Sequence, residues 1–204
     1  MKQNVWDRIE AARSRWNVLE HPFYTRWSAG ELSAEELARY SGQYRHAVEA
    51  VATVSSYVAD ELPDHPELAA HAREEAEHVA VWDGFVEAVG GDSGAEAGEE
   101  TRECAEAWTR RDGALSALAR LYAVESGQPA ISQTKLTGLA EHYGVTEAPG
   151  TTYFTVHRGR DVEHAAEGRE LLASLLTDAS SEDRAVAAAE EAFRANWKLL
   201  DGVS

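Results

Sequence analysis

Two histidines and an aspartate lie at helical spacing in the stretch His157-Arg158-Gly159-Arg160-Asp161-Val162-Glu163-His164. An α-helix turns by about 100° per residue, so positions i, i+4 and i+7 fall within roughly 60° of one another. His157, Asp161 and His164 therefore share one helix face. Two imidazoles and a carboxylate form a ligand set that suits iron, manganese or zinc. A helical bundle with a metal in its core needs this grouping, although spacing alone favours a solvated polar face equally.

The sequence around this stretch is helical in pattern over most of its length. Apolar residues recur every three to four positions, and Gly and Pro mark the ends of the periodic segments. Pro129 should kink one long helix, because proline lacks a backbone donor. Residues 92–100 are rich in Gly, Ala and Glu and should form the least ordered connector. The pattern predicts an all-α bundle of seven helices, at about 4–20, 33–60, 66–89, 101–111, 113–143, 151–176 and 181–200.

The composition is that of a single domain. The chain has 204 residues, of which 44% are apolar, and this is enough for one core spanning 1–204. There is no apolar run of 18 residues, and residues 1–7 lack the apolar region of a secretory signal. We therefore expect no membrane span and a cytoplasmic location. Cys104 is the only cysteine, which excludes an intrachain disulfide.

The chain is strongly acidic, with a formal net charge of −17 and only three lysines, Lys2, Lys135 and Lys198. Such a surface repels nucleic acid and anionic membranes, so neither is an expected partner. A well-solvated surface would explain the charge. Adaptation to high salt explains it better, because strong screening makes the self-repulsion tolerable and because lysine is so scarce.

A second group of candidate ligands lies in residues 71–78. Glu75 and His78 have the Glu-x-x-His spacing of carboxylate-bridged di-iron bundles. Glu74 stands four residues before His78 and His71 stands seven before it, so both lie on the same side of a helix. Acidic runs on helices are usually solvated, and taken alone this segment favours that interpretation.

Glu125 is a third candidate, at the end of the apolar run 117–124. A carboxylate buried in such a run needs a partner. An ion pair with Lys135 would supply one, and a metal ion would supply another. The three segments together offer three or four carboxylates and three histidines, which is about what two iron ions need.

Aromatic residues near these segments belong mostly to the expected core. One or two of them could line a substrate pocket or supply an oxidisable phenol near the metals. The aromatic candidates are Tyr40, Tyr44, Tyr122, Tyr153 and Phe154. Among all these residues, the candidates for a catalytic role are Glu125, Tyr44 and Tyr122.

Several motifs follow one another in the order found in haem-oxygenase-like diiron oxidases and oxygenases. They are LYAVESGQPAI (121–131), KLTGL (135–139), HYG (142–144), YFTVH (153–157) and DVEH (161–164), preceded by HPF (21–23), YSGQYRH (40–46) and VWDGF (81–85). The chain resembles this superfamily over nearly its whole length, and residues 122–164 are the specific part. The branch it resembles most is the CADD-like one, which supports para-aminobenzoate synthesis. Pyrroloquinoline quinone synthase and the TenA thiaminases share the fold.

The resemblance implies a seven-helix haem-oxygenase-like, TenA-like bundle with metal ligands at His78, Glu125, His157, Asp161 and His164. CADD-like relatives place a sixth ligand, a glutamate, seven residues before the first histidine, where this chain has His71. Other members use Glu-x-x-His, so Glu75 is our choice, and Glu74 and His71 are the alternatives. The cysteine nucleophile of the TenA thiaminases has no counterpart here, which argues against thiamin hydrolysis.

We therefore expect a non-haem di-iron oxidase or oxygenase. It would use dioxygen on a small organic substrate or a protein side chain, in cofactor or small-metabolite biosynthesis. Two iron ions are the expected cofactor, with manganese as an alternative, and a homodimer is the assembly that relatives suggest. One alternative function is a metal-free oxidase resembling pyrroloquinoline quinone synthase, in which the histidines act as acid/base groups. The non-enzymatic alternative is a TenA-like binding or regulatory module.

Overall fold

The computed structural model describes residues 4–204, and all the regular secondary structure in this range is helical. The predicted all-α class is therefore confirmed. Nine α-helices and one short 3₁₀-helix follow in the order α1 (Val5–Arg15), η1 (Val18–Glu20), α2 (Pro22–Ala29), α3 (Ala34–Glu61), α4 (Pro66–Ala88), α5 (Glu99–Trp108), α6 (Ala114–Glu125), α7 (Gln128–Glu141), α8 (Thr152–Leu175) and α9 (Ala179–Asp201). Among the described residues, no helix is both long and apolar enough to cross a bilayer.

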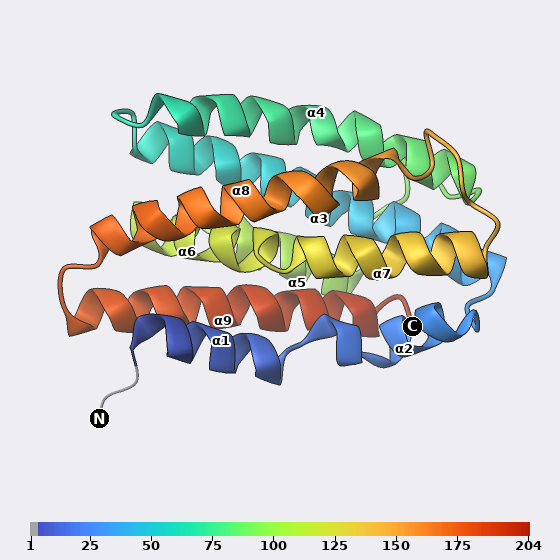
Figure 1. Ribbon diagram of the computed structural model, residues 1–204, viewed down its shortest axis with the longest axis horizontal. Coiled ribbons are helices and arrows are strands. Elements are labelled where there is room, and N and C mark those ends of the chain that lie inside the picture. The colour runs from blue at the N-terminus through green and yellow to red at the C-terminus, as the bar shows by residue number, and fades with distance from the viewer. Residues whose placement is uncertain (1–3) are drawn as a thin grey trace.

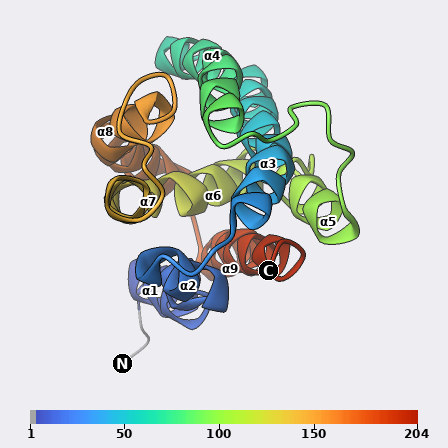
Figure 2. The same cartoon turned by 90° about the vertical axis from the view of Figure 1, so that its right-hand side faces the viewer.

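The long helices run side by side along the long axis of the molecule (Figure 1). In the end-on view, α6 lies in the middle of the bundle, and the other helices surround it (Figure 2). It packs against α3, α8 and α9, and every residue from Ser116 to Glu125 is buried. A polar side chain on α6 therefore points into the protein interior and needs a partner there.

The helix ends follow from local sequence. Ser33 opens α3 with a capping box: its Oγ accepts a hydrogen bond from the Glu36 N–H at 3.2 Å, and the Ser33 N–H donates to Glu36 Oε2 at 2.8 Å. This pair satisfies two backbone donors that a helix leaves free at its start. Asp178 opens α9 in the same way, through Ser181.

The first predicted helix, 4–20, ends earlier than expected, at Arg15. The sequence pattern treated Pro22 only as a helix breaker, but it is the first residue of α2. Proline suits this position because its missing N–H would have no intrahelical partner there. His21 caps the new helix, because its Nδ1 accepts a hydrogen bond from the Phe23 N–H at 3.0 Å.

The predicted long helix over 113–143 is two helices, not one kinked helix. α6 ends at Glu125, and α7 begins at Gln128 with Pro129 in its first turn. A proline ring collides with the carbonyl four residues earlier, so the chain breaks before Pro129 instead of bending through it. This break and the extra helix α2 raise the number of α-helices in residues 4–204 from the predicted seven to nine.

The connector 92–100 is better anchored than its composition predicted. Gln43 on α3 donates a hydrogen bond from Nε2 to the Glu96 carbonyl at 2.9 Å and accepts one from the Gly98 N–H at 2.8 Å. His46 Nε2 lies 2.9 Å from the Ala95 carbonyl. Side-chain contacts to the backbone thus replace the apolar contacts that the connector lacks.

Candidate metal centre

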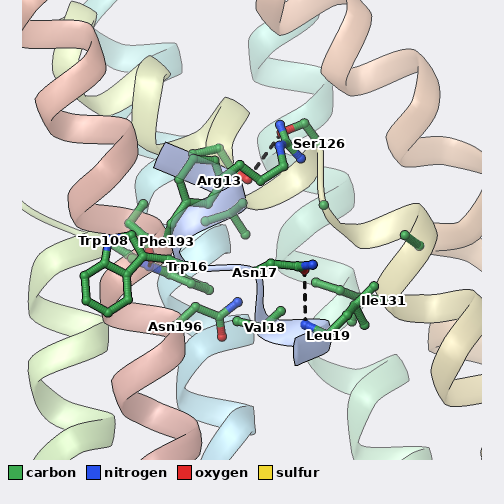
Figure 3. A pocket seen from close by; sticks show the side chains of 15 residues that line it. Arg13, Trp16, Asn17, Val18, Leu19, Trp108, Ser126, Ile131, Phe193 and Asn196 are labelled. Atoms are coloured by element: carbon green, nitrogen blue, oxygen red, sulfur yellow. Dashed lines mark hydrogen bonds between the residues drawn. The ribbon is translucent and has the colours of Figure 1, made fainter. Parts of the chain in front are cut away.

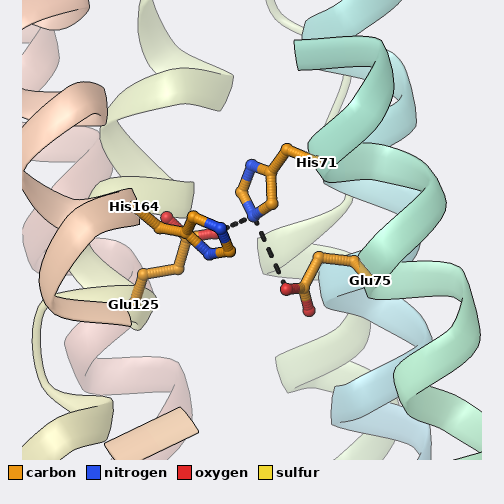
Figure 4. Close-up of side chains that lie close together, drawn as sticks. All are labelled: His71, Glu75, Glu125 and His164. Carbon is orange, nitrogen blue, oxygen red and sulfur yellow. Dashed lines mark ion pairs between the residues drawn. The ribbon is translucent and has the colours of Figure 1, made fainter. Parts of the chain in front are cut away.

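Four side chains from three helices meet between α4, α6 and α8 (Figure 4). They are His71 and Glu75 on α4, Glu125 at the end of α6, and His164 on α8. Each offers one nitrogen or oxygen atom, and these atoms all lie within 4.8 Å of one another. This spacing suits donors that surround a single metal ion.

A second group of donors adjoins the first. Glu75, His78 and His157 again place one nitrogen or oxygen atom each within 4.8 Å of the others. Glu75 belongs to both groups and is only 2% exposed. Because a carboxylate has two oxygens, Glu75 can face one metal position with each of them. The geometry is that of two adjoining positions with one shared carboxylate.

The hydrogen bonding of this cluster fits a metal centre. Buried polar atoms in folded proteins nearly always have a hydrogen-bond partner. Here several buried atoms have none within residues 4–204, although oppositely charged atoms lie nearby. These atoms are Nε2 of His71, Nδ1 of His78, Oε1 of Glu125, Nε2 of His157, Nδ1 of His164 and both carboxylate oxygens of Asp161. Such atoms, gathered at one place, suit coordination to a cation.

His157 is oriented by its own helix. Its Nδ1 lies 2.7 Å from the Tyr153 carbonyl, so that nitrogen carries the proton and Nε2 keeps its lone pair. Metal-binding histidines commonly donate their other N–H in this way. The Tyr153 ring stacks on the imidazole with centroids 3.8 Å apart. Burial lowers the pKa of His157 to about 4, so the ring is neutral at pH 7.

His71 is held by two carboxylates. Its Nε2 lies 2.9 Å from Glu125 Oε1 and 3.5 Å from Glu75 Oε1. Burial favours the neutral imidazole, but these carboxylates outweigh it and raise the pKa of His71 to about 10. Burial raises the pKa of Glu75 as well, yet His71 and His78 offset this and leave it well below its usual value. The protonated His71 therefore supplies positive charge where a metal ion would supply it.

Asp161 lies beside the cluster and belongs to neither group of four or three donors. Its carboxylate is 1% exposed, and Oδ1 lies 3.7 Å from His164 Nδ1. Burial raises the pKa of Asp161 to about 7. The side chain thus lies next to His164, a member of the first donor group, and its role as a ligand stays a prediction.

The structure separates the three alternatives for the N-terminal ligand. Glu75, our choice, lies inside the cluster, and so does His71. Glu74 lies at the edge of the cluster and belongs to neither donor group: its two oxygens are 2.9 and 2.8 Å from the Arg160 guanidinium, and Oε2 is 3.8 Å from His164 Nε2. His71 was one of the alternatives from the sequence, and residues 71, 75 and 78 repeat the i, i+4, i+7 spacing of 157, 161 and 164.

The candidate catalytic tyrosines lie in different surroundings. Tyr44 is buried beside Trp82, with ring centroids 5.2 Å apart, and its hydroxyl accepts a long hydrogen bond of 3.5 Å from Gln128 Nε2. Burial raises the pKa of Tyr44 to about 12, so it is a protonated phenol at pH 7. The Tyr122 ring packs instead against Trp6 of α1, with centroids 5.7 Å apart.

Lys135 on α7 does not form the ion pair with Glu125 that the sequence suggested as one alternative. Its Nζ lies over aromatic rings, 4.5 Å from the Tyr44 centroid, 5.1 Å from that of Tyr40 and 5.1 Å from that of Phe154. Burial lowers the pKa of Lys135 well below its usual value. The Glu125 carboxylate instead pairs with His71 and is available to a cation bound by the cluster.

Comparison with known proteins gives this geometry a context. A family described as iron-containing redox enzymes matches residues 39–197. The chain belongs to this family. As a family member it is an oxidoreductase, and the expectation of an enzyme rather than a binding module is confirmed.

Curated relatives agree with this assignment, and solved structures agree with the fold. The chain is 31% identical to a 4-aminobenzoate synthase of Chlamydia muridarum, with 98% of this chain and 90% of the relative covered. It is 30% identical to a 4-aminobenzoate synthase of Nitrosomonas europaea, with 99% and 90% covered. A TenA homologue of Pseudomonas syringae superposes with a TM-score of 0.83 at 17% identity, covering 98% of this chain and 90% of the homologue. A TenA homologue of P. horikoshii gives 0.78 at 14% identity, with 98% and 97% covered. The haem-oxygenase-like, TenA-like fold is therefore confirmed.

Proposed function

We propose that this protein is a non-haem di-iron oxidase or oxygenase that acts with dioxygen in the formation of a small aromatic cofactor precursor of the 4-aminobenzoate class. Family membership supports iron and redox chemistry, and the names of the curated relatives support the product class. The proposal of two iron ions is supported by one observation: Glu75 belongs to two adjoining groups of donors.

The described residues divide between two positions. His71, Glu125 and His164 would hold one iron ion, and His78 and His157 would hold the other. Glu75 would lie between them, with Asp161 as an additional carboxylate. Iron bound there would supply the electrons for the reduction of dioxygen. Carboxylates favour the higher oxidation states of iron, and the imidazoles would fix the geometry once His71 had released its proton to bind the metal.

The surrounding chain controls access to these donors. A cavity of about 50 Å³ adjoins the first group and is lined by His71, Glu125 and His164. Exposed Glu67 and Glu167 line the same cavity, so it reaches from the surface to the buried donors. A volume of about 50 Å³ has room for a molecule of the size of dioxygen, and the part of the wall that α6 contributes includes the buried, apolar Leu118 and Leu121. This route favours reaction with small molecules that diffuse in.

Two phenols adjoin the donors from the core side. The Tyr153 ring stacks on His157, and Tyr44 lies near Asp161 among buried aromatics. Both hydroxyls keep their protons at pH 7, because burial raises the pKa of each. They are therefore held as neutral phenols, the form in which loss of an electron is coupled to loss of a proton. An oxidised substrate could be such a side chain or a small aromatic molecule from outside.

Reconstitution with ferrous iron without oxygen tests the proposal. We expect about two iron ions per chain and rapid dioxygen consumption when air is admitted. Mass spectrometry of the chain before and after the reaction distinguishes side-chain oxidation, which changes its mass, from turnover of an added aromatic substrate. An iron-free chain that still consumes dioxygen would support the metal-free oxidase instead. A chain that binds iron but consumes no dioxygen under any of these conditions would contradict the proposal.

A further inference from the structure

A second cavity adjoins the end of α6 and contains none of the donors in its lining (Figure 3). Its volume is about 120 Å³, and η1, α6, α7 and α9 all contribute to its wall. Val124 and Ser126, the two neighbours of Glu125 in sequence, both line it. The cavity thus shares a wall with the candidate metal centre without containing any of its donors.

The size and lining of this cavity suit one aromatic ring. Trp16, Trp108 and Phe193 form much of its wall, and most of the lining is apolar. An apolar cavity of roughly 150 Å³ in another protein binds benzene, so about 120 Å³ is close to the space that a single ring needs. A fused or bulky ligand would not fit without movement of the walls.

One end of the cavity carries a cation. The Arg13 guanidinium lies 5.3 Å from the centroid of the Phe193 ring. Its Nη2 donates to Ser126 Oγ at 2.6 Å, and its Nε donates to Glu10 Oε2 at 3.0 Å. These two contacts fix the group at the edge of the cavity and leave Nη1 available. A fixed guanidinium at the mouth of an apolar cavity is suited to a carboxylate.

The other end carries an acceptor. Asn196 on α9 lines the cavity, and its Oδ1 is buried without a hydrogen-bond partner. Figure 3 shows Arg13 and Asn196 at separate edges, with aromatic side chains between them. Asn196 also lies close enough to Tyr44 to offset part of the rise that burial causes in the pKa of that phenol. A ligand N–H or O–H would satisfy Oδ1 and would adjoin a candidate catalytic residue.

We propose that this cavity binds a single-ring aromatic carboxylate that has an amino or hydroxyl group opposite the carboxylate. The carboxylate pairs with Arg13, the ring lies among Trp16, Trp108 and Phe193, and the ring substituent donates to Asn196 Oδ1. The choice of 4-aminobenzoate as the probe rests on the proposed function. The class of ligand is inferred from the residues that line the cavity and does not depend on that function. In this position the carboxylate end lies beside Ser126, the residue that follows Glu125, and the ring substituent lies at Asn196 Oδ1.

Calorimetric titration of the metal-free full chain tests the site. We expect 4-aminobenzoate to bind more tightly than benzoate, and benzoate at least about tenfold more tightly than aniline, because aniline has no carboxylate for a charge-assisted hydrogen bond with Arg13. Arg13→Gln should weaken 4-aminobenzoate binding at least about tenfold and leave aniline unchanged. Asn196→Leu should remove the preference for 4-aminobenzoate over benzoate. Arg15→Gln, which changes an exposed arginine two residues away that pairs with Glu190, should change nothing.

Several outcomes would overturn the inference. They are no binding of 4-aminobenzoate at millimolar concentration, equal binding of aniline and benzoate by the unaltered chain, or full affinity in Arg13→Gln. The comparison of ligands on the unaltered chain needs no variant, so it decides the matter even if a variant folds poorly. Iron and turnover play no part in the assay. A failure here therefore leaves the iron-binding experiment standing, and a failure to bind iron leaves this result standing.

Discussion

His71 on α4 faces His164 on α8, with ring centroids 4.2 Å apart. Seven residues further along α4, His78 faces His157, with centroids 4.4 Å apart. The two helices therefore run in opposite directions past each other, and each contributes the spacing His-x-x-x-acid-x-x-His. Each proposed iron position thus receives one histidine from each helix. This pseudo-twofold arrangement predicts how single substitutions change the number of iron ions bound.

Glu75 is the residue whose loss should affect both positions. Glu75→Ala should lower the iron content from about two ions per chain to less than one, because the carboxylate belongs to both donor groups. Glu74→Ala is the matched control, since Glu74 is adjacent but pairs with Arg160 outside the cluster. Metal analysis after anaerobic reconstitution measures both. Equal iron contents in the two variants would contradict the shared carboxylate.

His157→Ala and His71→Ala should each remove one position and leave the other. We expect about one iron ion per chain in each variant, with helical content unchanged by circular dichroism. The loss in His157→Ala follows from its free Nε2, and the loss in His71→Ala follows from its place beside Glu125 and His164. Two iron ions in His71→Ala would show that this histidine only balances charge in the metal-free chain.

The buried amine of Lys135 should lower the free energy of unfolding at neutral pH. Burial lowers its pKa in the folded chain, whereas the unfolded chain keeps a pKa near the usual 10.5. The unfolded state therefore binds more protons between these two values, and the free energy of unfolding rises with pH across that range. Lys135→Met should raise the melting temperature at pH 7, by about 2–4 °C for each kcal/mol gained.

The gain from Lys135→Met should shrink as the pH approaches 10.5, where the amine is neutral in both states. Thermal unfolding of metal-free protein at several pH values checks this. The aromatic rings around Nζ would favour the charged form instead, if their attraction outweighed burial. A fall in melting temperature at pH 7 that does not change with pH would contradict the account.

Tyr44 and Tyr122 should differ in their effect on catalysis. Tyr44→Phe should slow dioxygen-dependent turnover by at least about tenfold, since it removes a hydroxyl that lies near the donors. Tyr122→Phe should leave turnover unchanged, because the Tyr122 ring packs on Trp6 and its hydroxyl belongs to neither donor group. Both changes delete one oxygen and keep the ring, so iron content serves as the control for folding. Equal rates in the two variants would remove Tyr44 from the candidate catalytic residues.

The sequence predicted the fold class and most candidate donors because both depend on helical periodicity. Helical spacing alone predicts that His157, Asp161 and His164 share a face, and it likewise predicts that Glu75 and His78 do. The sequence could not decide between Glu74 and Glu75, because adjacent residues differ by about 100° around the helix and either could point inward. Arg160 settles the orientation, and it lies 86 residues away from Glu74 in the chain.

Other features depend on contacts that periodicity does not report. The aromatic rings around Lys135 come from α2, α3, α4 and α8. The sequence of α7 alone therefore could not predict them. The break between α6 and α7 follows from Pro129, but the sequence does not say whether proline bends a helix or ends it. From the sequence, His71 was only an alternative ligand, because the acidic run around it resembles a solvated face.

The account depends most on two metal positions that share Glu75. Crystals of iron-loaded protein, measured on both sides of the iron absorption edge, test this directly. We predict two anomalous peaks per chain, each next to one histidine of α4 and one of α8, with Glu75 between them. A single peak, or two peaks of which one does not touch Glu75, would contradict the proposed di-iron centre.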